Sequence, residues 1–227
     1  QEGDPISEIE HKVRFVKRWF GEIFMYADRV QAISHYLADW AKSKRAKCIS
    51  VIPNGVDVFW FDPEQTPIES TRENFWKAKN KNISKHQILL TISRLVEKNA
   101  IDQVIKALPE LQNTHFVILG EGQKRIELER LAETLHVQDR VHFEGLISHS
   151  SIIHYLHHSD IFIRPSRSEG MGNSFIEAMA AEVPVIATPV GGIVDFLHDG
   201  ETGLLCKVDD PKSIAEAVLR YQSDPLL

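Results

Sequence analysis

The sequence predicts an α/β fold: an open, doubly wound parallel sheet with helices on both faces, as in Rossmann-like domains. Short β-branched runs recur along the 227 residues, and each is followed by a longer stretch with apolar residues at i, i+3 and i+4. Strands that alternate with helices form right-handed βαβ units, and these build parallel sheets. About six such units follow Gln87, too few for a closed eight-stranded barrel.

The individual elements follow from the same two periodicities. Apolar, β-branched runs predict strands at residues 29–33, 49–52, 87–93, 116–119, 141–144, 161–164, 184–188 and 204–208. Helical spacing predicts helices at residues 99–108, 123–135, 152–157, 174–181, 193–197 and 212–222. In the second helix, Leu128, Leu131 and Leu135 share one face, and Lys124 and Arg130 lie on the other.

The chain divides near Pro53. Proline and glycine are dense from Pro53 to Pro67, which is typical of a linker and not of a packed element. We therefore expect residues 1–52 to be the tail of an N-terminal domain and residues 53–86 to be an interdomain linker and entry segment. Residues 87–227 are expected to form a self-contained C-terminal domain, truncated at its end, so that the chain is a fragment of a longer protein.

Composition excludes several classes of protein. Twenty-six Lys and Arg against 32 Asp and Glu give a net charge of -6, which argues against nucleic acid or an anionic membrane as the main partner. The apolar runs fall short of the roughly 20 residues of a membrane-spanning helix, and the acidic start does not resemble a signal peptide. The two cysteines have no CxxC spacing. We expect a cytoplasmic protein.

The most informative loop follows the expected strand 161–164, because ligands of open parallel sheets bind beyond the carboxyl ends of the strands. It carries Glu169, two glycines, and then Glu177 in the next helix. The glycines let backbone amides approach an anion, and the helix start adds unpaired N–H groups. The two acids suit the hydroxyls at the two ends of a nucleotide sugar. Ser174 and Glu177 also fit a capping box, which explains both without a ligand.

Two more loops lie at the same expected edge. Arg94 and Lys98 follow the strand 87–93, where a guanidinium fork and an ammonium suit a diphosphate; a solvated turn is the alternative. Gly120 and Gly122 begin a G-x-G, but Arg125 stands where a dinucleotide fingerprint has its third glycine. This substitution argues against a nicotinamide-dependent oxidoreductase.

His154 and His158, at i and i+4, are spaced to share a metal ion, but no third ligand has a recognised spacing. An exposed helix face is the favoured interpretation. We expect no metal site.

The loops form an ordered set. The set consists of Val-Ile-Pro-Asn-Gly-Val-Asp at 51–57, Ser-Arg-Leu at 93–95, Pro-Ser at 165–166, Glu-Gly-Met-Gly at 169–172, Glu-Ala-Met-Ala at 177–180, Pro-Val-Ile-Ala-Thr at 184–188, Val-Gly-Gly at 190–192 and Gly-Glu-Thr-Gly-Leu-Leu at 200–205. From about residue 27 to residue 221 the chain thereby resembles the retaining GT-B glycosyltransferases of family four, the glycosyl transferases group 1.

This resemblance implies the C-terminal, donor-binding half of a GT-B fold. It implies an enzyme that transfers a sugar from a nucleotide-diphosphate sugar, such as a UDP or GDP sugar, to an acceptor with retention of configuration. No metal or other cofactor is implied, so positive side chains and amides would neutralise the leaving diphosphate.

The resemblance also assigns roles to individual residues. Arg94 and Glu169 are the implied catalytic residues: Arg94 would contact the diphosphate, and Glu169 would bind the donor sugar near the reacting carbon. Glu177 would hold the ribose hydroxyls, and the loop after Gly145 would border the base. The implied donor-binding residues are Lys98, Asn99, Gly120, Gly145, Leu146, Gly170, Met171, Gly172, Asn173, Ser174 and Glu177.

Three positions depart from the family pattern. Family members carry Lys, often followed by Gly, where this chain has Asn99 and Ala100, and Lys98 lies one residue early. Either Lys98 binds the phosphate in place of the missing lysine, or phosphate binding is weaker than in the family. Glu182 stands in place of a helix-ending glycine that can require a positive φ, and Asp195 stands where Glu is usual.

Two other functions remain open. A nucleotide-sugar 2-epimerase has the same layout, and Asn99 suits a degenerate, non-catalytic nucleotide-sugar-binding subunit. The expected partners are the nucleotide-sugar donor and an acceptor sugar, lipid or glycan that the missing N-terminal domain binds. Nucleic acid is not expected, and a membrane is expected only through the missing part. The fragment is expected to bind nucleotide without turning over by itself.

Overall fold

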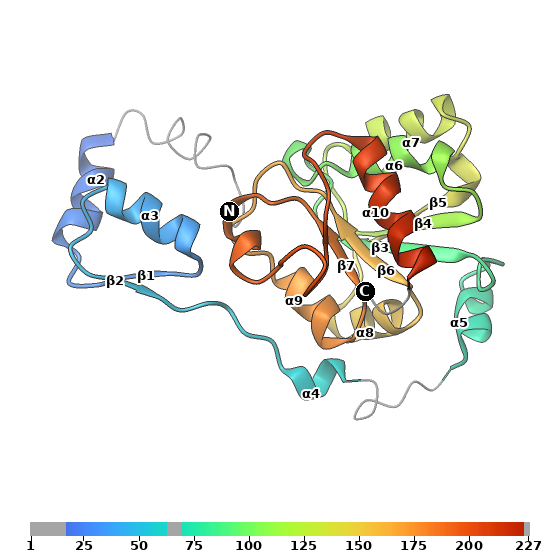
Figure 1. The fold of residues 1–227 in the computed structure, drawn as a ribbon, viewed down its shortest axis with the longest axis horizontal. Helices are drawn as coiled ribbons and strands as arrows, with labels where there is room; N and C mark the ends of the chain where they lie inside the picture. Colours follow the sequence, from blue (N-terminus) through green and yellow to red (C-terminus); the bar gives the residue numbers. More distant parts are fainter. Residues whose placement is uncertain (1–16, 63–69, 225–227) are drawn as a thin grey trace.

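The computed structural model describes residues 17–62 and 70–224, which form a small N-terminal unit and a larger α/β domain (Figure 1). One extended stretch of chain connects the two. The expectations for the acidic start and for Pro63 and Pro67 lie outside the described residues.

The larger domain is built on a six-stranded sheet with the order β5-β4-β3-β6-β7-β8, in which every neighbouring pair is parallel. From β3 the chain runs outward to β5 and then returns to place β6 beside β3. This reversal confirms the predicted doubly wound topology. The strands are β3 (Gln87–Ile92), β4 (Thr114–Leu119), β5 (Val141–Gly145), β6 (Ile161–Arg164), β7 (Val185–Ala187) and β8 (Leu204–Leu205).

Helices cover both faces of this sheet (Figure 1). Alternate side chains of a strand point to opposite faces, so Leu89 enters one core while Ile88 and Leu90 enter the other. The first face carries α6 (Ile101–Ala107), α7 (Arg125–Thr134) and α10 (Pro211–Ser223), and the second carries α5 (Arg72–Ala78), α8 (His149–His157) and α9 (Asn173–Ala180). Short 3-10 turns occur at η2 (Glu97–Asn99), η3 (Leu108–Glu110), η4 (Gln138–Arg140) and η5 (Gly191–Asp195).

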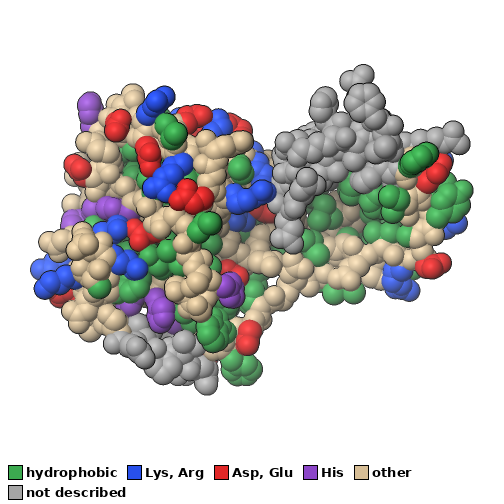
Figure 2. Space-filling model, turned by 180° about the vertical axis from the view of Figure 1, so that it is seen from behind, with side chains coloured by type: hydrophobic (Ala, Val, Ile, Leu, Met, Phe, Trp, Pro, Cys, Tyr) green, Lys and Arg blue, Asp and Glu red, His purple; other side chains and the backbone are tan. Residues whose placement is uncertain are grey.

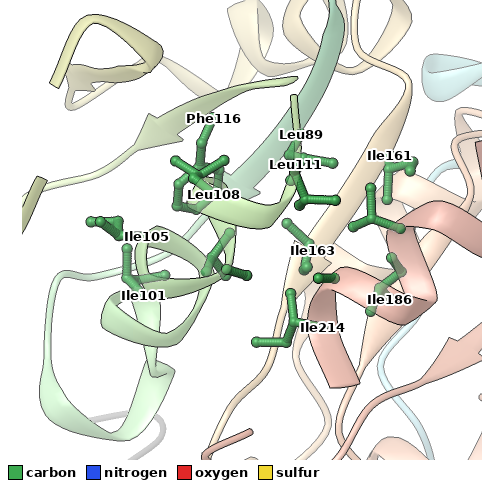
Figure 3. Packing of buried hydrophobic residues seen from close by; sticks show 14 of the residues in the cluster. Leu89, Ile101, Ile105, Leu108, Leu111, Phe116, Ile161, Ile163, Ile186 and Ile214 are labelled. Atoms are coloured by element: carbon green, nitrogen blue, oxygen red, sulfur yellow. The ribbon is translucent and has the colours of Figure 1, made fainter. Parts of the chain in front are cut away.

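Burial of aliphatic side chains stabilises the first core. Figure 3 shows that the sheet contributes Phe116 and Ile163 and that the helices contribute Ile105 and Ile214. Each of the four is at most 1 % exposed, and burying a side chain of this size contributes about 1.5–3 kcal/mol. The sheet is therefore held rigidly from both sides, which fixes the positions of the loops at its edges.

The predicted strands and helices of the larger domain largely agree with the structure, but the sequence did not predict α2 and α3, the strand expected at 204–208 is only Leu204–Leu205, and two further regions differ. Residues 193–197 were expected to be a helix, but η5 forms instead over Gly191–Asp195, because the Phe196 amide bonds back three residues to Ile193. The expected linker 53–86 contains packed elements, α4 (Val58–Phe61) and α5. Thr71 caps α5, and its Trp76 is fully buried in the second core.

The N-terminal unit contains α2 (Lys17–Tyr26) and a parallel pair, β1 (Val30–Ala32) and β2 (Ile49–Val51), joined by α3 (His35–Ser43). Ser34 caps α3. The His35 amide donates a hydrogen bond to Asp195 Oδ2 at 2.7 Å, so the start of α3 lies against η5 of the larger domain.

Acidic and basic side chains are interspersed over the part of the larger domain that Figure 2 shows. On this face, no extended area carries charge of a single sign. Across residues 17–62 and 70–224, no helix has the length and apolarity required to cross a membrane.

Candidate functional site

The residues implied to bind a donor all lie at the carboxyl edge of the sheet. They follow, or end, the four strands β3, β4, β5 and β6. Because β3 and β6 are the neighbours at which the strand order reverses, this edge is where open parallel sheets bind their ligands.

The loops after β3, β4 and β5 meet at glycines. The Gly120 amide donates to the Gly145 carbonyl at 2.7 Å. Gly120 has φ +139°, and a Cβ on it would lie 2.0 Å from the Ser93 carbonyl oxygen. Only glycine at position 120 permits this approach, so the loops after β3, β4 and β5 can lie in direct backbone contact. Leu146, the next residue after Gly145, is exposed.

The side chain of Asn99 forms a hydrogen bond within the loop after β3. Its side-chain amide donates to the Arg94 carbonyl at 2.7 Å, and the residue is 4 % exposed. The sequence resemblance led us to expect a lysine here, whereas Asn99 supplies hydrogen-bonding groups and no positive charge. Lys98 is also buried, and its carbonyl accepts from the Arg167 amide at 2.7 Å. Arg94 is exposed at the edge.

Glu169 is held in a buried ion pair that sequence reasoning missed. Arg164, the last residue of β6, donates through Nη2 to Glu169 Oε2 at 2.7 Å, and the Gly170 amide donates to Oε1 at 3.0 Å. Both side chains are under 10 % exposed. An arginine inside the apolar run of β6 was the available signal, because arginine is rarely buried without a partner.

Arg164 has further partners. Its Nη1 donates to Ser174 Oγ at 2.9 Å and to the Ile92 carbonyl at 3.2 Å. Burial lowers the pKa of the guanidinium, and the carboxylates of Glu169 and Glu177 oppose that shift. The group stays charged, because arginine is not deprotonated in proteins.

The capping-box alternative for Ser174 and Glu177 is wrong. Helix α9 begins after Gly172, which has φ +81°, and no side chain caps it. Ser174 lies inside the helix, where its hydroxyl accepts from Arg164. Glu177 is buried, with Oε1 3.2 Å from His149 Nε2 at the start of α8. His149 is a second residue that sequence reasoning missed.

Other residues of the loop after β6 contact the crossing segment and the N-terminal unit. Met171 is buried, and Asn173 Oδ1 accepts from Asn54 Nδ2 at 2.9 Å. A Cβ on Gly170 would contact Leu37 of α3 at 3.4 Å. The loop after β6 therefore reaches both the crossing segment and the N-terminal unit.

Gly191 and Gly192 enclose the same loop. A Cβ on Gly191 would lie 1.7 Å from the Glu169 carbonyl oxygen, and one on Gly192 would lie 2.0 Å from the Gly170 carbonyl oxygen. These glycines bring η5 into direct backbone contact with the loop that carries Glu169.

Buried polar atoms without a partner gather at this edge. They belong to β3, β6 and the loops that follow them. Within the described part of the chain they are Thr91 Oγ1, Ser93 Oγ, Asn99 Oδ1, Arg164 Nε and Ser166 Oγ; the others belong to Arg72, His86, His157 and His158. Buried polar groups are normally hydrogen-bonded, so this concentration suits a polar ligand.

The described ranges contain no group of three or more His, Cys, Asp or Glu side chains that could hold a metal ion. His158, expected on an exposed face, is 4 % exposed, with its ring centroid 4.5 Å from that of Phe75. Burial lowers its pKa to about 4.

A doubly wound sheet with close-packed glycines and two buried glutamates in the loops at its reversal point is an arrangement typical of α/β domains that bind ligands at this edge. Residues 72–227 match the family model described as "Glycosyl transferases group 1". The chain belongs to this family, and the predicted Rossmann-like, GT-B type of domain is confirmed.

Curated relatives include the N-acetyl-alpha-D-glucosaminyl L-malate synthase of Bacillus anthracis, 29% identical over 87% of this chain and 51% of that protein. Another is the GDP-mannose-dependent alpha-(1-6)-phosphatidylinositol monomannoside mannosyltransferase of Mycolicibacterium smegmatis, 30% identical over 88% of this chain and 54% of that protein. The chain spans about half the length of these relatives.

Solved structures share the fold. Anabaena Alr3699/HepE in complex with UDP-glucose has a TM-score of 0.85 at 21% identity, over 96% of this chain and 60% of that one. Sucrose-phosphate synthase from Thermosynechococcus elongatus has a TM-score of 0.80 at 26% identity, over 94% of this chain and 53% of that one.

Proposed function

We propose that this chain is the donor-binding part of a glycosyltransferase that uses a nucleotide-diphosphate sugar. The observation that supports this most directly is the buried Glu169, fixed by Arg164 and the Gly170 amide beside unpaired polar atoms. Relatives and structural neighbours bear names with GDP-mannose and UDP-glucose, which makes these two donor classes the first to test. In the full-length protein, the sugar would pass to an acceptor with retention of configuration.

Each part of the edge would meet one part of the donor. Glu169 would accept hydroxyls of the sugar, and Glu177 would accept those of the ribose. Arg94, Lys98 and the amides at the start of α9 would neutralise the diphosphate, because a helix N-terminus presents unpaired N–H groups and a positive dipole end. We expect no essential metal, since these groups would stabilise the leaving diphosphate.

The acceptor and the cellular context extend this proposal. We expect another part of the full-length protein to bind the acceptor sugar, lipid or glycan, and the chain alone to bind the donor without transferring it. We propose the cytoplasm as the compartment. The tail character of residues 1–52 remains a prediction, supported by the two-stranded β1–β2 pair, which is smaller than an independently stable sheet.

Calorimetric titration of this chain tests the proposal. UDP, GDP and ADP, and then UDP-glucose and GDP-mannose, are titrated with and without magnesium. We expect saturable binding of one base that does not require the metal. Absence of binding by every nucleotide at millimolar concentration would contradict the proposal for this chain.

A pair of variants locates the site. Glu177→Ala removes a charged acceptor of the ribose hydroxyls, and loss of such a bond costs about 1.5–3 kcal/mol, or roughly 10- to 100-fold in affinity. Glu216→Ala, on the exposed side of α10, is the matched control and should bind as the unmodified chain does. Melting temperatures of both variants separate lost binding from lost folding.

One observation favours a second candidate, a nucleotide-sugar-binding subunit without transferase activity. Asn99 is bonded to the Arg94 carbonyl and supplies no cation. Asn99→Lys separates the two candidates. A gain in nucleotide affinity of about tenfold, equal to 1.4 kcal/mol, would indicate a weakened phosphate site, whereas unchanged affinity would indicate that Lys98 already serves it.

A further inference from the structure

Arg164 is a buried cation inside the candidate site that contacts three separate elements. Its guanidinium bonds to the end of β3 through the Ile92 carbonyl, to α9 through Ser174 and to the loop through Glu169. The face of Phe175 lies 4.3 Å from Cζ. With these partners on separate elements, the guanidinium has one position available to it.

The loop is shaped around this guanidinium. A Cβ on Gly172 would lie 2.4 Å from Arg164 Nη2 and 2.7 Å from Phe175. Glycine at position 172 therefore leaves the space that the arginine fills. Gly172 also has φ +81°, so the same residue satisfies a steric and a conformational requirement at once.

The ion pair between Arg164 and Glu169 offsets the negative charge that Glu169 would otherwise present to a diphosphate. A buried carboxylate without a partner is driven toward its neutral form, and as an anion it would repel the diphosphate of a donor. Arg164 Nη2 lies 2.7 Å from Glu169 Oε2, so the positive guanidinium offsets the charge of this carboxylate beside the donor. An ionised carboxylate has about four lone-pair positions, and protein groups occupy two of them.

We propose that Arg164 is a positioning residue for the donor sugar: it holds the Glu169 carboxylate in one orientation, with its remaining lone pairs directed to sugar hydroxyls. This inference rests on the proposed function, because it names the residue on which sugar recognition at that site depends. Arg164 has no contact with the sugar in this account and acts through Glu169.

The test compares a nucleotide with its sugar conjugate. The sugar increment is the dissociation constant of UDP divided by that of UDP-glucose, and GDP with GDP-mannose is measured in parallel. Arg164→Gln should lower the sugar increment by about tenfold, the loss of one charge-assisted hydrogen bond, so the affinity for the sugar conjugate should fall more than the affinity for the free nucleotide. Arg164→Lys, which keeps the charge and loses the fork, should recover part of it.

A second variant distinguishes positioning from general structure. Glu169→Gln should lower the sugar increment by itself and add nothing further to Arg164→Gln. Arg140→Gln is the matched control, because Arg140 also donates to backbone carbonyls but lies away from this edge.

Each outcome supports or overturns the positioning role of Arg164. If Arg164→Gln weakens nucleotide and conjugate by the same factor, the residue is only structural and the inference fails. If the unmodified chain binds a nucleotide without any sugar increment, the inference fails while nucleotide binding stands. If the chain binds no nucleotide, the proposed function fails first. Should Arg164→Gln not fold, Arg164→Lys and Glu169→Gln provide the same comparison.

Discussion

Replacing Gly191 by alanine should displace the loop that carries Glu169. The residue has φ +57°, and an added Cβ would lie 1.7 Å from the Glu169 carbonyl oxygen and 2.9 Å from its carbonyl carbon. A left-handed backbone costs alanine roughly 1–2 kcal/mol. Relief of the overlap requires a shift of about 2 Å, since non-bonded heavy atoms pack at about 3.5–4.0 Å. That shift breaks the hydrogen bond from the Gly192 amide to Glu169, which adds about 1 kcal/mol.

Gly200 provides the matched control. It has φ +77°, and a Cβ placed there meets nothing within 4 Å, so Gly200→Ala carries the backbone cost alone. At about 2–4 °C per kcal/mol for a chain of this size, Gly200→Ala should lower the melting temperature by a few degrees. Gly191→Ala should lower it at least twice as much and should also weaken binding of UDP-glucose or GDP-mannose, because Glu169 moves. Equal melting temperatures and unchanged sugar affinity in the two variants would refute the reasoning.

Three further predictions concern the core, the pH dependence and the contact between the two units. Trp76→Ala should lower the free energy of unfolding, measured in urea, by about 3–5 kcal/mol, because Trp76 is fully buried. The control is Trp60→Ala, because the Trp60 side chain is 43% exposed. Equal effects of the two substitutions would contradict this prediction. Burial lowers the pKa of His115 and of His142 to about 4 from the usual 6.5. The unfolded chain therefore binds protons at a higher pH than the folded chain, so the contribution of these two histidines to the free energy of unfolding is fully present above pH 6.5 and is lost as the pH falls toward 4. Urea midpoints across that range should fall less steeply in His142→Gln than in the exposed-site control His198→Gln, and parallel curves would argue against these histidines. Asp195→Ala should accelerate hydrogen exchange of the His35 amide, which donates to Asp195, whereas Asp39→Ala on the exposed side of α3 should not; identical exchange in both would show that this bond does not hold the units together.

The strands and most helices of the larger domain were predictable because their signals are local. The periodicity of residues 87–92 or 161–164 is visible in a short window and needs no knowledge of the neighbouring strands. Helix α5 also has a local signal, the Thr71 cap. The prolines and glycines upstream obscured it, since they indicated a linker over the whole stretch.

The edge of the sheet was predictable, but the contacts within it were not. Arg94, Glu169 and Glu177 were expected there because parallel strands bring their carboxyl ends together. The pairing of Arg164 with Glu169, and of His149 with Glu177, depends on how the loops fold back in space. The same dependence explains the error at Ser174, whose local pattern fits a cap while its hydroxyl bonds to Arg164.

The connection between the two units has an evolutionary consequence. Every residue proposed to recognise the donor lies between Arg94 and Glu177, and one crossing of the chain, at residues 52–57, joins that stretch to the N-terminal unit. Recombination at this joint would exchange the N-terminal unit and keep all the residues proposed to recognise the donor on one piece of chain. A new N-terminal unit would have to reproduce the contacts described between the two parts: the Ser34 side chain beside Gly192, the His35 amide on Asp195 and Leu37 beside Gly170. The hydrogen bond from Asn54 to Asn173 lies on the crossing segment itself and would travel with it.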